Sequence, residues 1–319
     1  MLRYILKRLL MLIPVLLGVS LLIFFIMELT PGDPVIMVLG EGYSEEEYLA
    51  KQEEMGLNEP FVVRYCKYVL DAVRGDFGNS YRNGQSVLTE IVARLPYTIR
   101  LAVSGMLIAI IFGIPMGILS AVKQYSIVDN VLTILSLVLT SMPGFWLAMM
   151  MILLFSVTLG WLPSVGVDEW NSFIMPAIAT GASTMAALQR MTRTTMLEVI
   201  RQDYIRTARA KGATETKIIV KHALRNALLP VITVIGVNFG FALGGSIVIE
   251  AVFAIPGLGQ LMINSIKSLD TPMVTGAVLF AALIATLINL IVDIVYTYID
   301  PRVKAQLIRT GMKKKKVTT

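Results

Sequence analysis

The sequence predicts an all-α membrane protein with six transmembrane helices and with both chain ends on the cytoplasmic side. Hydrophobic residues make up 55% of the 319 residues, and charged residues make up only 16%. A typical soluble domain is about half apolar and about a quarter charged, so this balance indicates that lipid is the main solvent. Uncharged runs then locate the spans, and the positions of Lys and Arg give the orientation.

Five uncharged runs have the length of roughly 20 residues that a helix needs to cross the hydrocarbon core. They cover residues 9–27, 101–122, 170–189, 226–249 and 271–292. A sixth run, 130–167, is longer than one span needs and slightly short of two. We predict one long helix over residues 131–159, with a kink at Pro143.

The distribution of basic residues supports six spans. With both termini inside, 20 of the 28 Lys and Arg residues fall on the cytoplasmic side. Two spans within 130–167 would instead place the loop 190–225, with nine basic residues, outside. The positive-inside bias opposes that arrangement.

The first apolar run has an alternative explanation as a cleaved signal peptide, because Arg3, Lys7 and Arg8 form a basic region before it. The run is longer than a usual signal sequence, and no small-residue cleavage site follows it. We therefore predict an uncleaved first span within residues 1–30 and a basic cytoplasmic tail at 301–319.

Residues 31–98 form a predicted extracytoplasmic insert, with eleven acidic and six basic residues. A helix is expected at 44–55, because Ser44 and Glu47 fit a capping box and Gly56 fits the position after the helix. The insert is either a solvated connection between two spans or a docking surface for a partner that carries substrate. Its charge does not decide between them.

The remaining polar residues exclude several site classes. Cys66 is the only cysteine and His222 is the only histidine, so the sequence offers no disulfide and no Cys-rich or three-histidine metal site. No acidic residue lies in the middle of a predicted span, which argues against a proton-driven carrier. The basic residues lie at the ends of apolar runs, so membrane topology explains them better than nucleic-acid binding does.

Small and polar residues on two predicted spans are candidates for helix packing or for the wall of a pathway. Gly236, Gly240 and Gly244 recur every four residues and therefore share one face of a helix. Such a stripe lets helices approach closely, and we favour packing over a smooth pore wall. Asn238 and Asn289 are expected either to hydrogen-bond between helices or to face the pathway.

The inner loop at 203–230 is the most informative segment. It predicts a short basic helix, a stop at Gly212 and a second helix that begins after Thr214 and leads into the fifth span. These features have a simpler explanation, because any cytosolic loop between spans tends to be basic and helical. The first helix is small enough for a partner's groove to receive it.

This loop resembles the EAA loop of permeases from ATP-binding-cassette (ABC) importers. Arg206, Thr207 and Ala208 take the Glu-Ala-Ala places, and Gly212 takes the glycine place. The departures from the pattern, Arg206 among them, are similar to those of the peptide/nickel branch of these permeases. Further motifs of that branch are Arg8-Leu-Leu-Met-Leu-Ile-Pro-Val-Leu-Leu-Gly-Val-Ser20, Leu29-Thr-Pro-Gly-Asp-Pro34, Gly75-Asp-Phe-Gly78, Arg94-Leu-Pro-Tyr-Thr98, Ser141-Met-Pro-Gly144, Glu250-Ala-Val-Phe-Ala-Ile-Pro-Gly-Leu-Gly259 and Asp300-Pro-Arg302.

The resemblance implies a type I importer permease fold, with a five-helix core at 99–300 and a coupling loop at 194–229. Asp203, Arg206, Thr207, Ala208, Arg209 and Gly212 would belong to the helix and turn that couple to an ATPase. The implied partners are a homologous second permease, two cytosolic ATPase subunits that bind ATP and Mg, and an extracytoplasmic substrate-binding protein, in a bacterial or archaeal cytoplasmic membrane. The chain itself has no Gly-Lys dipeptide and hence no phosphate loop, so we expect no enzyme activity and no cofactor in it.

The resemblance also implies the substrate class. Dipeptides or oligopeptides are expected first, with nickel chelates, glutathione or haem as alternatives on the same scaffold. An ATP-independent secondary carrier is the alternative from another class.

Overall fold

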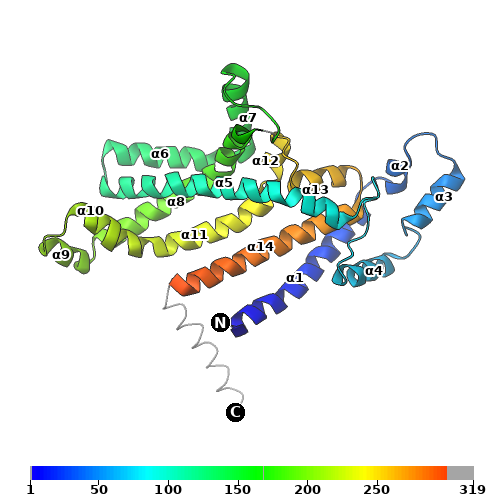
Figure 1. Cartoon of the computed structure of the whole chain (residues 1–319), viewed down its shortest axis with the longest axis horizontal. Coiled ribbons are helices and arrows are strands. Elements are labelled where there is room, and N and C mark those ends of the chain that lie inside the picture. Colours follow the sequence, from blue (N-terminus) through cyan, green and yellow to red (C-terminus); the bar gives the residue numbers. More distant parts are fainter. Residues whose placement is uncertain (1, 168, 300–319) are drawn as a thin grey trace, which may run out of the picture. The chain divides into compact units, whose positions relative to one another are not determined.

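The computed structural model describes residues 2–167 and 169–299, and this part of the chain contains helices and loops but no strand (Figure 1). Three short segments deviate from α-helical geometry: η1 and η3 are π-helical, and η2 is a 3-10 turn. The elements are α1 (Leu2–Leu29), α2 (Pro34–Leu39), α3 (Glu45–Glu54), α4 (Phe61–Val73), α5 (Val87–Val122), α6 (Ile127–Ser141), α7 (Gly144–Met151), η1 (Ile152–Thr158), η2 (Trp170–Phe173), α8 (Ile174–Ile200), α9 (Asp203–Ala210), α10 (Glu215–Lys217), η3 (Ile218–Ala223), α11 (Leu224–Gly245), α12 (Ile247–Val252), α13 (Leu258–Lys267) and α14 (Thr271–Ile299).

The predicted all-α membrane fold is confirmed. Four helical stretches are long and apolar enough to cross a bilayer, at Arg8–Leu29, Val87–Val122, Glu215–Ala242 and Thr271–Val292. A fifth span results if α6 and the helix that follows it count as one. The count of six spans and the orientation with both ends inside stay predictions, and the basic tail at 301–319 lies outside the described residues.

The single helix predicted over 131–159 is wrong. α6 ends at Ser141, and the next helix begins at Gly144 with a bend of 104°. Proline explains the break: Pro143 lacks an N–H, and Met142 before it has the extended conformation (ψ 126°) that a following proline favours. A bend of this size makes the pair a broken span or a re-entrant segment, not a kinked helix.

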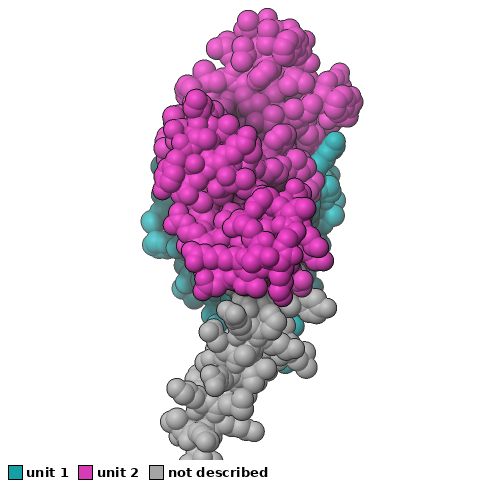
Figure 2. Space-filling model, turned by 90° about the vertical axis from the view of Figure 1, so that its left-hand side faces the viewer, with its two compact units in different colours: residues 1–100, 243–286 teal, residues 101–242, 287–319 magenta. Residues whose placement is uncertain are grey.

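The chain divides into two compact units, which Figure 2 shows in different colours. Unit 1 comprises Met1–Arg100 and Leu243–Thr286, and unit 2 comprises Leu101–Ala242 and Leu287–Thr319. The boundary at Arg100 lies close to the predicted end of the insert at residue 98. The predicted core at 99–300 is divided between the two units, because 243–286 packs with the N-terminal part of the chain.

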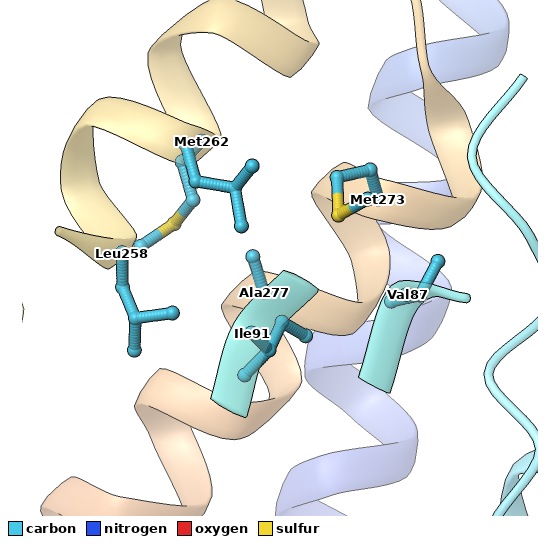
Figure 3. Packing of buried hydrophobic residues seen from close by; sticks show 7 residues of the cluster. Val87, Ile91, Leu258, Met262, Met273 and Ala277 are labelled. Atoms are coloured by element: carbon cyan, nitrogen blue, oxygen red, sulfur yellow. The ribbon is translucent and has the colours of Figure 1, made fainter. Parts of the chain in front are cut away.

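The core of unit 1 is an apolar cluster where α5, α13 and α14 meet (Figure 3). Val87 and Ile91 of α5 are fully buried there, against Leu258 and Met262 of α13 and Ala277 of α14. Residues of the insert therefore contribute to the same core as the segment that follows α11. This packing fixes the start of α5 against α13.

Within the insert, the helix predicted at 44–55 is confirmed as α3. Ser44 accepts a hydrogen bond from the Glu47 N–H, Glu47 accepts one from the Ser44 N–H, and Gly56 has φ +68°. α4 is not a free solvated segment, because it lies along α1. Arg64 forms an ion pair with Glu28 at 2.6 Å, and the Tyr65 hydroxyl donates to the Leu17 carbonyl at 2.9 Å.

Unit 2 is held by close contact between α5 and α8. A Cβ added at Gly181 would lie 2.4 Å from the Gly105 carbonyl oxygen, so these helices touch through their backbones. α6 is attached to α8 by a bidentate ion pair, in which Arg193 donates to both carboxylate oxygens of Asp129 at 2.7 and 2.8 Å. Asp129 is almost fully buried, and the pair supplies the charge compensation that burial requires.

Candidate functional site

The turn after α9 is a complete helix-ending motif. Gly212 has φ +80°, its N–H donates to the Arg209 carbonyl at 3.0 Å, and the Ala213 N–H donates to the Ala208 carbonyl at 3.2 Å. These two bonds are the Schellman pattern, which favours glycine at the left-handed position. The predicted helix stop is confirmed. Thr214 occupies the predicted N-cap position of α10, but its side chain makes no capping hydrogen bond.

α9 is attached to unit 2 through one apolar face. Ile205 is fully buried in a cluster with Met196 of α8 and Ile218 of η3, and Ala208 packs against the same cluster. The Tyr204 hydroxyl accepts a hydrogen bond of 2.9 Å from the Asn226 side chain. These contacts tie α9 to α8 and to the beginning of α11, so a force on α9 reaches both long helices directly.

The opposite face of α9 is polar and exposed. Asp203, Arg206 and Thr207 lie there, and Arg206 and Asp203 form only a loose, solvent-exposed ion pair at 3.7 Å. Arg209 donates to the Glu215 carboxylate at 2.6 and 3.1 Å, which closes the turn, and this hydrogen bond raises the pKa of the guanidinium. The exposed face is therefore free for a partner, while Arg209 also holds the turn.

The structure separates the residues predicted for this segment. Gly212 and the polar residues lie at the surface, whereas Ala208 faces inward and is partly buried. Ala208 therefore packs α9 against the apolar cluster of unit 2. The sequence reasoning missed Ile205, Tyr204 and Asn226, although an isolated apolar residue in a basic helix is a signal for an anchor.

The glycine stripe of α11 packs against α14 within unit 2. A Cβ added at Gly236 would lie 1.9 Å from Val292, and one at Gly240 would lie 2.9 Å from the Asn289 side-chain oxygen. Two of the three glycines are thus at a close helix contact, as the packing interpretation expects. The surroundings of Gly244 lie outside the described part of the chain.

The two asparagines differ in their surroundings. Asn238 donates to the Val234 carbonyl of its own helix at 2.8 Å, so the described contacts show no bond from it to another helix. Asn289 is exposed at the edge of the contact with Gly240. An exposed amide beside a close helix contact is compatible with either role that the sequence suggested.

A buried carboxylate organises the segment after α11. Glu250 is fully buried and accepts hydrogen bonds from the Thr98 hydroxyl at 2.7 Å, the Ser246 hydroxyl at 3.0 Å and the Gly259 N–H at 2.7 Å. Glycine is needed nearby, since a Cβ at Gly257 would lie 2.3 Å from a Glu250 carboxylate oxygen. Two motifs that the sequence shows separately, 94–98 and 250–259, thus form one hydrogen-bonded unit.

Two protein-family models together match most of the chain. Residues 113–305 match the family "Binding-protein-dependent transport system inner membrane component", and residues 1–102 match the N-terminal family "Binding-prot-dependent transport system membrane comp, N-term". The boundary between the two matches lies near the boundary of unit 1 at Arg100.

Curated relatives are similar over almost the whole chain. The "Glutathione transport system permease protein GsiC" of Salmonella choleraesuis (strain SC-B67) is 42% identical over 304 residues, which is 95% of this chain and 99% of the relative. The protein of the same name from Escherichia coli (strain K12) is 41% identical over the same shares. Among solved structures, an inward-facing conformation of the MetNI methionine ABC transporter matches with a TM-score of 0.58 and 21% identity, over 67% of this chain and 97% of that chain. At this identity the structural match shows the fold alone.

Proposed function

The chain belongs to the family of binding-protein-dependent transport system inner membrane components, and we propose that it is the permease subunit through which an ABC importer brings short peptides into a bacterial cell. Membership in the family makes it a membrane component of an ABC importer. The peptide substrate, the homologous second permease in a heterodimer and the site of coupling are parts of the proposal.

The observation that carries the proposal is the construction of α9. Its inner face is anchored by Ile205 to the core of unit 2, and its outer face presents Asp203, Arg206 and Thr207 without a partner element over them. A short helix built in this way can bind a partner at its outer face. Through its inner face it then transmits the partner's displacement to the core of unit 2. We propose that the outer face docks in a groove of a cytosolic ATPase subunit, which binds ATP and Mg.

The mechanism follows from this attachment. When ATP draws two ATPase subunits together, each pulls its docked helix, and α9 carries α8 and α11 with it through Ile205 and the Tyr204–Asn226 hydrogen bond. The spans thereby alternate between outward and inward access. ATP drives the cycle only because it binds the two states with different affinity.

Among short peptides, glutathione is the first candidate. The relatives with 41–42% identity are named as glutathione permeases, and they are covered over 99% of their length. Other dipeptides or oligopeptides, nickel chelates and haem are the alternatives within the same mechanism. An ATP-independent carrier would transport glutathione as this chain alone under an ion gradient, and such uptake would replace the proposal.

The test is ATP-driven uptake of glutathione into proteoliposomes that hold this chain, its second permease, the ATPases and the binding protein. Gly212→Asp is expected to lose most uptake, because a side chain at φ +80° strains the turn by about 1–2 kcal/mol and adds a negative charge beside α9. Nothing lies within 4 Å of the added Cβ, so the chain should still fold.

The matched control is Gly56→Asp. Gly56 has φ +68°, also has nothing within 4 Å of an added Cβ, and ends the helix α3 in the insert. It should therefore transport nearly as the parent does. Equal uptake by the Gly212→Asp variant and the parent would defeat the role given to α9, whereas loss of uptake in both variants would show a general effect of strain.

A further inference from the structure

Unit 1 contains a polar cavity of about 270 Å³ at the start of α5 and beside α13. Its polar lining comes from three segments that are distant in sequence: the loop before α5, the first turns of α5, and α13 with the residues after it. The lining includes Arg82, Asn83, Glu90, Arg94, Gln260 and Asn264. A second cavity, of about 340 Å³, shares Arg82, Asn264 and Ser268 with the first and adds Lys267. The two are therefore neighbours, and their shared lining, the junction, contains the positively charged Arg82.

The acidic residues Glu90 and Asp270 line the first cavity only. Glu90 forms an ion pair with Arg94 one helical turn away. The buried carboxylate of Asp270 accepts hydrogen bonds from the Ser80 hydroxyl and from the Tyr81 N–H at 3.1 Å. Glu90 is thus neutralised by Arg94, whereas Asp270 has only neutral donors among the described residues and keeps its negative charge in the first cavity. The lining of the second cavity contains no acidic residue from the described part of the chain, so the excess positive charge lies there.

The two remaining cations are uncompensated. Within residues 2–167 and 169–299, Arg82 and Lys267 form no ion pair, and both are exposed residues in the lining of the second cavity. Unpaired cations beside amides that can donate hydrogen bonds are the arrangement that binds an anion. Asn264 lies at the junction itself, and Asn83 and Gln260 line the first cavity.

Both cations stand on prearranged elements. The Arg82 N–H donates to the Ser80 hydroxyl oxygen at 3.2 Å, and Ser80 is attached to Asp270, so the loop is held at the start of α14. The helix that ends with Lys267 is held in turn by the Glu250 carboxylate at its first residues. The backbone positions of both cations are therefore fixed before a ligand binds.

We propose that these two neighbouring cavities bind the carboxylate end of a peptide-like group, with Arg82 and Lys267 on the carboxylate at the second cavity and with Asn83, Asn264 and Gln260 on the neighbouring amide groups. The proposal rests on the proposed function for the ligand class. The carboxylate has two sources, the transported peptide itself or an acidic side chain of the substrate-binding protein. Both present the same chemistry to this chain.

The test uses the membrane complex of both permeases and the ATPases, without the binding protein, in lipid nanodiscs, with Arg82→Gln, Lys267→Gln and the double variant. The control is Arg74→Gln, because Arg74 is an exposed cation of the same unit that lines neither cavity and forms only a 3.8 Å pair with Asp71. Equilibrium dialysis measures the binding of radiolabelled glutathione. Its diethyl ester, which lacks free carboxylates, serves as the negative control and should compete poorly. A separate titration measures the docking of the substrate-free binding protein.

Each single variant should weaken one of these two affinities by about three- to fivefold, which is the size expected for exposed charge pairs, and the double variant should weaken it more. Weaker glutathione binding with unchanged docking assigns the carboxylate to the peptide. Weaker docking with unchanged glutathione binding assigns it to the binding protein. Parent-like values of both affinities in the double variant would overturn the proposal.

A failure of this proposal can be distinguished from a failure of the proposed function. A parent transporter that takes up no glutathione with ATP would defeat the proposed function, whereas the two binding measurements would still decide the role of the cavity. Arg82→Lys provides a further check, since a retained charge should preserve most of the affinity if the cavity binds an anion.

Discussion

Replacement of Thr98 by valine tests the hydrogen-bonded unit around Glu250 most directly. The Thr98 hydroxyl donates to the Glu250 carboxylate at 2.7 Å and accepts from the Leu258 N–H at 2.8 Å, and Thr98 is 2% exposed. Valine has nearly the same volume, so the substitution removes both hydrogen bonds without leaving a cavity.

The expected cost is the sum of two losses. The Leu258 N–H is left buried without an acceptor, which costs about 1–3 kcal/mol, and the carboxylate loses a hydrogen bond of about 1.5–3 kcal/mol. Because the two bonds share one network, simple addition gives an upper limit, and we expect a loss of about 3–5 kcal/mol in the free energy of unfolding. The segment from α12 to α13 should loosen first.

The matched control is Thr275→Val. Thr275 is also fully buried in unit 1, but its hydroxyl bonds only to the Thr271 carbonyl of its own helix at 2.9 Å. Unfolding in mixed detergent micelles, followed by circular dichroism, gives both free energies. If Thr98→Val costs no more than the control, which should lose less than about 1 kcal/mol, the unit around Glu250 does not stabilise the fold as argued.

Two further predictions concern helix packing and orientation. Gly236→Ala should lower the free energy of unfolding by about 1–3 kcal/mol through overpacking, since the added Cβ would overlap α14. The control Gly18→Ala, with nothing within 4 Å of the added Cβ, should cost nothing. Equal unfolding free energies of the two variants would contradict the close contact of α11 with α14. In a Cys66→Ser background, a membrane-impermeant maleimide should label Glu53→Cys from outside intact cells and Ala210→Cys only after the membrane is opened, and labelling of Ala210→Cys from outside would refute the orientation.

Much of the insert at 31–98 is packed against the rest of unit 1. The sequence left 31–98 as either a solvated connection or a docking surface, but α4 lies along α1 and the start of α5 belongs to the apolar core of unit 1. Of its helices, α3 has the solvated character that its charges suggested, with the exposed Glu45, Glu46 and Glu47 in its first turn. A surface for a partner is therefore to be sought at the polar cavity, not over the whole insert.

Local features were determined by the sequence alone, because they depend on contacts within a few residues. The capping box of Ser44 and Glu47 and the helix stop at Gly212 involve partners three to five residues apart, and both form as predicted. The position of the break at Pro143 was also visible, since proline acts on its own helix. Its 104° bend was not, because only the packing of the helices on either side of the break sets their angle.

Tertiary structure decided which residues meet across the chain. Thr98 and Glu250 are 152 residues apart and Ser80 and Asp270 are 190 apart, and no periodicity in the sequence predicts such pairs. In the same way, Ile205 is an ordinary apolar residue in a basic loop until the fold buries it beneath α9. The sequence shows which groups need partners, but the free energy that selects those partners comes from burial, which exists only once the helices have packed.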